Sequence, residues 1–122
     1  NIIILGKIDH ILLKSETINA IERFHDFDLP TDKTCRFGSW YHDFGASHFS
    51  GSKTFTRMEE PHEKFHTALS TALGYIDHGS DDIFKHKQEI KDQFIFAESM
   101  TEELFELMDA TLLEQEAYEA SH

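Results

Sequence analysis

Four side chains in this sequence have the chemistry of a zinc site. Cys35 is the only cysteine of the chain, and His62 and His66 lie four residues apart. A further histidine, His10, lies upstream. One thiolate and three imidazoles are a complete tetrahedral donor set for zinc, provided that the fold brings their three segments together. The pattern therefore predicts a closed zinc site, which depends on the elements that carry these residues.

Each of these residues has a plainer interpretation when it is taken alone. Two histidines spaced like His62 and His66 project from the same side of a helix, but such a pair can also border a core without binding metal. His10 alone fits a buried, hydrogen-bonded imidazole, and Cys35 alone fits a small apolar core residue. Their joint occurrence favours a metal site, because a three-segment bundle can direct all four to one centre.

Apolar residues recur at helical spacing along most of the chain. This spacing predicts long helices over about 2–24, 53–77 and 82–118. Pro61 is expected to kink the second of these, and a short helix or turn is expected to follow Cys35 and to close at Gly45. No stretch alternates convincingly with period two. The fold class is therefore predicted to be all-α, a four-helix-bundle-like domain with a short Cys-bearing helix.

Length and charge limit the possible partners. With 122 residues the chain is expected to form one domain over 1–122, with a motif-bearing core at about 6–80 and the long C-terminal helix after it. A formal charge of −12 would repel nucleic acid and anionic lipid surfaces. The lone cysteine and the lack of a signal segment or a long apolar run predict a cytoplasmic protein without membrane insertion.

Three strings in the sequence carry a family resemblance. KIDHILLK, CRFGSWYHDFG and FTRMEEPHEKFH resemble, in order, spacing and flanking residues, the three segments of the chemoreceptor zinc-binding (CZB) domain of bacterial cytosolic signalling proteins. The resemblance spans about Gly6 to Leu73, and Phe37 stands where the family often has leucine. It implies that one zinc ion is held by His10, Cys35, His62 and His66.

The resemblance also implies a regulatory function rather than an enzymatic one. Members of the family sense zinc, or oxidants such as hypochlorous acid through the Cys–zinc centre. They typically act as homodimers attached to methyl-accepting chemoreceptors, which control chemotaxis, or to diguanylate cyclases. Because the sequence begins at Asn1 rather than Met and its last periodic segment ends shortly before His122, we expect a C-terminal piece of a soluble chemoreceptor.

The donor set indicates where such a site could react. Zinc itself has no redox chemistry, so the reactive atom is the sulfur of Cys35, and its oxidation would weaken the bond to the metal. The packing residues expected to move with it are Phe37, Gly38, Trp40 and Tyr41. An alternative is that zinc merely staples a small dimerisation module without any sensing.

HEKFH also matches the zincin motif His-Glu-x-x-His. In that class of peptidase the glutamate, here Glu63, activates a water molecule on zinc. Against this, Leu69 stands where the metzincin extension requires glycine, and four protein ligands leave no open position for water. A zinc hydrolase is therefore the less favoured alternative.

Carboxylates next to the donor residues could orient the imidazoles. Asp9, Glu59 and Glu60 are neighbours of the donors in sequence. Adjacent residues of a helix face different directions, so Asp9 would have to reach another helix to make a contact. We expect all three to be solvated acids.

Overall fold

The computed structural model of the protein describes residues 2–49 and 51–121, and every regular element in that part of the chain is helical. This confirms the predicted all-α class. Asn1, Ser50 and His122, which the expected domain includes, lie outside the described residues. The elements in chain order are α1 (Ile2–Glu22), α2 (Arg36–Trp40), the π-helical turn η1 (Tyr41–Gly45), α3 (Ala46–Phe49), α4 (Lys53–Thr56), α5 (Glu59–Gly74), the 3-10 turn η2 (Tyr75–His78), α6 (Ser80–Lys85) and α7 (Lys87–Ser121).

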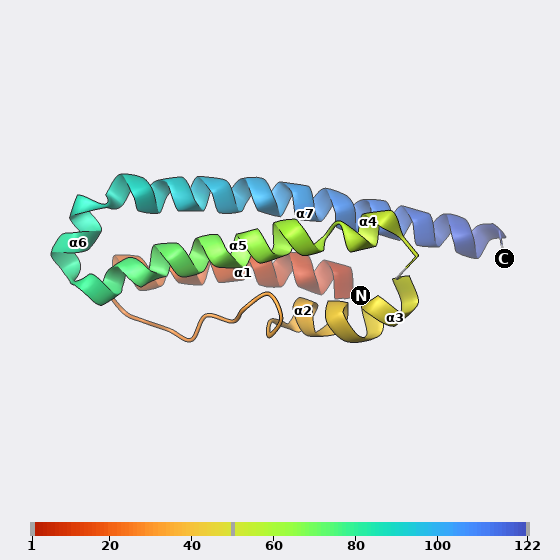
Figure 1. Ribbon diagram of the computed structural model, residues 1–122, viewed down its shortest axis with the longest axis horizontal. Coiled ribbons are helices and arrows are strands. Elements are labelled where there is room, and N and C mark those ends of the chain that lie inside the picture. Colours follow the sequence, from red (N-terminus) through yellow and green to blue (C-terminus); the bar gives the residue numbers. More distant parts are fainter. Residues whose placement is uncertain (1, 50, 122) are drawn as a thin grey trace.

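The long helices α1, α5 and α7 lie side by side, and α7 runs antiparallel to the other two (Figure 1). Among the described elements, α5 and α7 make the most extensive contact. The segment between α1 and α2 runs back along the bundle, and the short helices α2, α3 and α4 gather near the N-terminal end of α1 (Figure 1). This return path brings Cys35 to the middle of α1. The last turns of α7 extend beyond the other helices.

The core of the described residues has three clusters, two of which contain or adjoin the candidate donor residues, while the third packs the C-terminal ends of α1 and α5 against Ile90 of α7. One of the two clusters beside the donors contains Phe37 and Met58, both fully buried, beneath the short helices. The other contains Phe65 and Leu69 of α5, packed with Ala97 of α7. Apolar packing from both of these clusters therefore flanks the place where the donors meet.

Helix α1 has two apolar stripes, and only one of them faces this core. The buried stripe includes Ile3, His10 and Leu13. The other stripe is 40–57% exposed and consists of Ile4, Leu5, Ile8, Ile11 and Leu12. The periodicity of the sequence predicts the helix correctly, but a helix that is apolar on two sides does not reveal which side packs inward.

The ends of α1 and of the short helices differ from the predicted ones. Helix α1 stops at Glu22 because Phe24 takes a left-handed conformation (φ 52°), with His25 N–H donating to the carbonyl of Ala20. This is a Schellman ending, in which glycine is the usual residue. The helical segment after Cys35 does not close at Gly45 but continues as α3 to Phe49.

Two of the predicted long helices are interrupted. The helix that begins with α4 ends at Thr56, and a separate helix, α5, begins at Glu59. Pro61 therefore lies in the first turn of α5 and does not kink a longer helix. A proline is tolerated there because the amides of a first turn have no partner within the helix. The segment predicted as one helix over 82–118 is also divided, with α6 ending at Lys85 and α7 beginning at Lys87.

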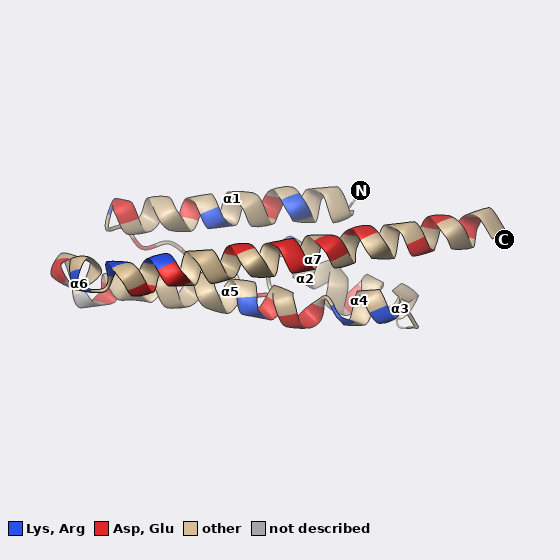
Figure 2. Ribbon diagram, turned by 90° about the horizontal axis from the view of Figure 1, so that it is seen from above, with Lys and Arg blue, Asp and Glu red and all other residues tan. Residues whose placement is uncertain are grey.

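Acidic residues dominate the charged surface, especially at the start of α5 and along α7 (Figure 2). Lysine and arginine are fewer and scattered. Two lysines of α1 reach α7, Lys7 to Asp109 and Lys14 to Glu98. No helix in the described part of the chain is both long and apolar enough to span a membrane.

Candidate metal centre

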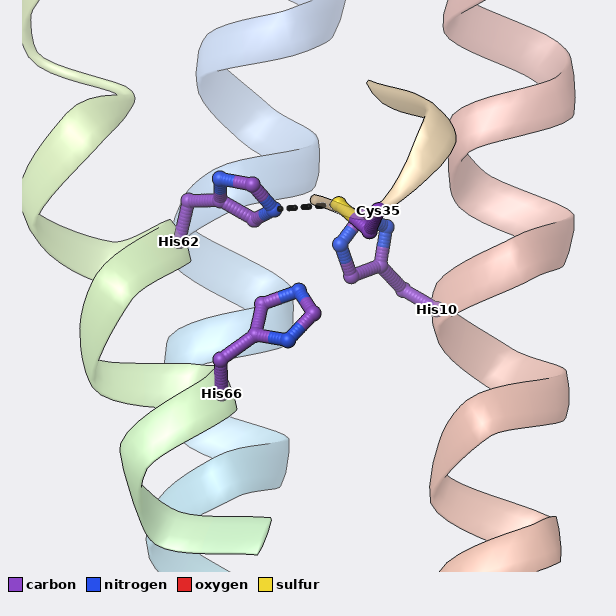
Figure 3. Close-up of side chains that lie close together, drawn as sticks. All are labelled: His10, Cys35, His62 and His66. Atoms are coloured by element: carbon purple, nitrogen blue, oxygen red, sulfur yellow. Dashed lines mark hydrogen bonds between the residues drawn. The ribbon is translucent and has the colours of Figure 1, made fainter. Parts of the chain in front are cut away.

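The structure brings the four predicted donor residues together. His10 comes from α1, His62 and His66 come from successive turns of α5, and Cys35 directly precedes α2 (Figure 3). One nitrogen from each histidine and the cysteine sulfur all lie within 4.8 Å of one another. All three histidines are at least 96% buried. The group can therefore hold one metal ion inside the bundle.

Backbone carbonyls fix the orientation of two of the imidazoles. Nδ1 of His10 lies 2.6 Å from the carbonyl oxygen of Gly6, and Nδ1 of His66 lies 2.9 Å from that of Pro30. A carbonyl oxygen can only accept, so each Nδ1 carries the proton and each Nε2 is left with a lone pair. Neither Nε2 atom has a hydrogen-bond partner within the described residues, although both are buried. A cation bound between these two nitrogen atoms would satisfy both of them.

His62 completes the group with the cysteine. Its Nε2 atom lies 3.3 Å from Sγ of Cys35, although 27 residues separate them in sequence. Zinc bonds of the usual lengths to nitrogen and sulfur place donor atoms about 3.3–3.8 Å apart in a tetrahedron. The pair already has this spacing, and small side-chain movements bring the other donors within it. The residues present therefore fit a zinc ion.

The buried setting keeps the histidines ready to bind a cation. Burial lowers the pKa of His62 to about 2 and that of His66 to about 4, and it also lowers the pKa of His10. All three imidazoles are therefore neutral at pH 7. Burial raises the pKa of Cys35, so that its thiol keeps its proton until a cation draws the proton away.

A tight turn holds Cys35 in place. Its side chain caps the N-terminus of α2, where the amide of Gly38 donates to Sγ over 3.2 Å. A Cβ atom added at Gly38 would lie 1.7 Å from the carbonyl oxygen of Asp32 and 3.3 Å from Sγ. Glycine is needed here because the backbone of α2 passes so close to the preceding loop.

Comparison with known families identifies the domain. The family model of the chemoreceptor zinc-binding domain matches residues 10–73, just over half of the chain, and includes all four donors. The chain belongs to the CZB family. Neither the curated proteins nor the solved structures gave a significant match. CZB domains bind zinc, and this chain has a group of donors that fits the ion.

Three aromatic residues of the segment after Cys35, which we call the aromatic wedge, pack against the core: Phe37, Trp40 and Tyr41. Phe37 is fully buried, and its ring lies 5.3 Å from that of His62 and 5.9 Å from that of His10, centre to centre. Trp40 is half-buried against the same core, and Tyr41 stacks on Phe55 of α4 at 4.3 Å. The aromatic side chains of this segment thus pack it against the donors and against α4.

Sequence reasoning missed one polar contact beside the site. Asp9 is not a solvated acid, because Arg36 donates to both of its carboxylate oxygens, at 2.7 and 2.9 Å. This hydrogen bond holds the pKa of the Asp9 carboxyl below its usual value. Glu60 pairs with Lys64 on the surface of α5, whereas Glu59 is exposed, as expected.

The glutamate of the zincin motif lies away from the donors. Glu63 is exposed on the outer face of α5, where it lines a surface cavity together with Glu59 and Glu103. His62 and His66 of the same helix are buried, whereas Glu63 is exposed. Sγ of Cys35 lies 3.3 Å from Nε2 of His62, so that it can take the fourth coordination position, which a zincin leaves to water.

Proposed function

We propose that this CZB domain is a regulatory sensor in the cytoplasm of a bacterial signalling protein, most simply a soluble chemoreceptor that controls chemotaxis. Its stimulus is zinc, an oxidant such as hypochlorous acid, or both. Zinc bound by His10, Cys35, His62 and His66 holds the segment after Cys35 against α1 and α5. Loss of the cysteine bond releases this segment, and the change reaches the output domain through the helices packed on it.

The position of Cys35 carries this proposal. The histidines project from the long helices α1 and α5, whereas Cys35 lies at the start of a five-residue helix, α2, at the end of a loop. A short element is easier to displace than a helix packed along its whole length. The donor with reactive chemistry is thus the one that lies outside the long helices.

Oxidation would act through the sulfur. The thiolate of Cys35 attacks the chlorine-bearing oxidant, and the net reaction with hypochlorous acid gives a sulfenic acid and chloride. Sulfur loses two electrons, and the chlorine of the oxidant gains them. A sulfenic acid is a poorer zinc ligand than a thiolate, so the Cys35 side chain leaves the donor group. Phe37, Gly38, Trp40 and Tyr41 follow, because they belong to the same short segment.

The exposed apolar stripe of α1 supports the proposal of a homodimer. Its five side chains are 40–57% exposed, and they form a continuous row along the helix: Ile4, Leu5, Ile8, Ile11 and Leu12. A row of this kind is expected to be covered in a stable assembly. We propose that a second copy of the chain covers it, which would place both zinc sites beside the dimer interface.

Two other functions make different predictions. A structural staple would hold zinc but would not respond to oxidant, and a zinc hydrolase would cleave peptides with the help of Glu63. The outward position of Glu63 and the contact of Cys35 with His62 speak against the hydrolase. Neither observation separates a staple from a sensor, so an experiment must do so.

The test is an oxidant titration of the zinc-loaded protein. Native mass spectrometry of protein purified without chelators should give one zinc per chain. One equivalent of hypochlorous acid should then release zinc to a chromogenic dye and change the near-ultraviolet circular dichroism of Trp40 and Tyr41. No release at all would favour the staple, and release without any spectral change would contradict the oxidant switch. Peptide cleavage that Glu63→Gln abolishes would establish the hydrolase instead.

A further inference from the structure

The residue after Cys35 is tied to α1 by a two-point ion pair. Arg36 Nη2 lies 2.7 Å from Oδ1 of Asp9, and Arg36 Nε lies 2.9 Å from Oδ2. Asp9 directly precedes His10, so the pair joins the immediate neighbours of two donor residues. Parallel hydrogen bonds between a guanidinium and a carboxylate fix orientation as well as distance.

A cavity leads past this ion pair to the donors. It has a volume of about 310 Å³, and Asp9, His10, Cys35 and Arg36 are among the residues that line it. Its other walls come from α1 and from the loop that ends at Cys35. The side chains of Asp9 and Arg36 are 30% and 57% exposed, which places the ion pair at the boundary between the cavity and the solvent.

Most other polar contacts of Cys35 stay within its own segment. Its amide donates to the carbonyl of Thr31 at 3.0 Å, and its sulfur accepts from the amide of Gly38. Such contacts shape the turn but do not attach it to α1. Arg36 provides that attachment, together with the apolar packing of Phe37 on Gly6.

We propose that the Asp9–Arg36 ion pair is a clasp that controls how fast small solutes reach Cys35 through this cavity and how fast the metal leaves. When the pair opens, residues 35 and 36 can move away from α1, which widens the cavity, and the sulfur becomes hydrated. The side chains of Asp9 and Arg36 touch neither the sulfur nor the donor nitrogens. They act by holding residues 35 and 36 in position against α1. The metal half of this proposal rests on the proposed zinc site, and the access half does not.

The access half is tested on the metal-free protein with iodoacetamide, a small neutral reagent. Cys35 is the only thiol, so mass spectrometry follows its alkylation directly. Asp9→Asn and Arg36→Gln should each accelerate the reaction about fivefold, and Arg36→Lys, which keeps the charge but loses the two-point geometry, should have an intermediate effect. The charge-reversed pair Asp9→Arg with Arg36→Asp should return the rate to within about twofold of the unmodified protein.

A matched control separates the clasp from a general loss of stability. Glu60→Gln breaks another ion pair, Glu60–Lys64, on the outer face of α5 and should leave the alkylation rate unchanged. Unchanged rates in Asp9→Asn and Arg36→Gln would overturn the clasp. So would a double variant as fast as the single ones, because the effect would then come from the residues separately.

The metal half uses the same variants loaded with zinc. A chromogenic chelator in excess should remove the ion faster from Asp9→Asn and Arg36→Gln, and the reversed pair should restore slow removal. Equal rates in all variants would overturn this half. If the protein holds no zinc, the proposed function fails, whereas the alkylation experiment still decides whether the clasp exists.

Discussion

The Nε2 atom of His62 lies 3.3 Å from the sulfur of Cys35, and this contact joins α5 to the start of α2. Several features of the site follow from it. The cysteine is held on the side of His62 that faces His10 and His66 (Figure 3). The short aromatic segment after the cysteine is thereby docked on the centre of the bundle, so its position depends on the donors staying together.

Gly38→Ala should displace the cysteine. The added methyl group would overlap the carbonyl oxygen of Asp32, so either the loop or α2 must move. We expect a loss of about 1–3 kcal/mol in the free energy of unfolding, as for other overpacked sites, together with weaker zinc binding. Urea unfolding and a competition titration with a zinc chelator measure the two effects.

Gly74→Ala is the matched control for this substitution. Gly74 ends α5, and a Cβ atom there would meet nothing within 4 Å among the described residues. The change should leave zinc affinity unaltered and stabilise the helix by about 0.5–1 kcal/mol. Equal behaviour of the two alanine variants would contradict the steric role given to Gly38.

Tyr41→Phe should weaken the link between the aromatic wedge and α4. The buried hydroxyl of Tyr41 donates to the carbonyl of Phe55 at 2.7 Å, and its loss leaves that carbonyl without this partner. We expect the free energy of unfolding to fall by about 1–2 kcal/mol in urea unfolding. Tyr75→Phe removes a hydroxyl that has no hydrogen bond within the described part of the chain, and it should cost less than about 0.5 kcal/mol.

The metal-free protein should lose stability as the pH falls below about 6.5, the usual pKa of histidine. Burial lowers the folded-state pKa of His62 to about 2 and that of His66 to about 4, so the unfolded chain binds more protons between these values and pH 6.5. Each of the two groups should remove about 1.4 kcal/mol per pH unit across its window. Urea midpoints between pH 7.5 and pH 5 measure the slope.

Zinc binding tests whether the buried imidazoles cause this pH dependence. Bound zinc should keep the stability nearly constant down to lower pH, because protons must then displace the ion from the imidazoles. A stability of the metal-free protein that does not change between pH 7.5 and pH 5 would contradict the buried neutral histidines.

Ile8→Glu should dissociate the proposed dimer. Ile8 is 47% exposed in the middle of the outward stripe of α1, and a carboxylate there would have to be buried in the interface. Sedimentation velocity should show monomers for this variant at concentrations where the unmodified chain is dimeric, with zinc content unchanged. Phe84→Glu, at a site on α6 that is 79% exposed, should keep the dimer. A dimer that survives Ile8→Glu would place the interface elsewhere.

The sequence predicts the helices, and the pairing of His62 with His66, because both depend on local pattern, whereas the family resemblance adds His10 and Cys35. Residues such as His62 and His66 show their shared face through spacing alone. Contacts between elements are different: the reach of Arg36 to Asp9 and the carbonyl of Pro30 beside His66 arise only when distant segments meet. The sequence also does not predict the end of the helix before Pro61. The helical spacing of apolar residues continues across this point, although the helical backbone conformation does not.

The two stripes of α1 show a further limit of periodicity. Leu12 and Leu13 are adjacent and equally apolar, yet Leu13 is buried and Leu12 is 53% exposed. Composition cannot distinguish an intramolecular core from a surface that another chain covers. Which stripe is buried depends on the side of α1 that faces α5. His10 indicates that side only once it is known to be a metal donor.

Zinc K-edge X-ray absorption of the purified protein tests the metal site most directly, because it reports the donor atoms around the ion. The site formed by His10, Cys35, His62 and His66 predicts one sulfur at about 2.3 Å and three nitrogens at about 2.0–2.1 Å, with the sulfur shell lost in Cys35→Ala. A spectrum with nitrogen and oxygen alone, or one that Cys35→Ala leaves unchanged, would contradict it.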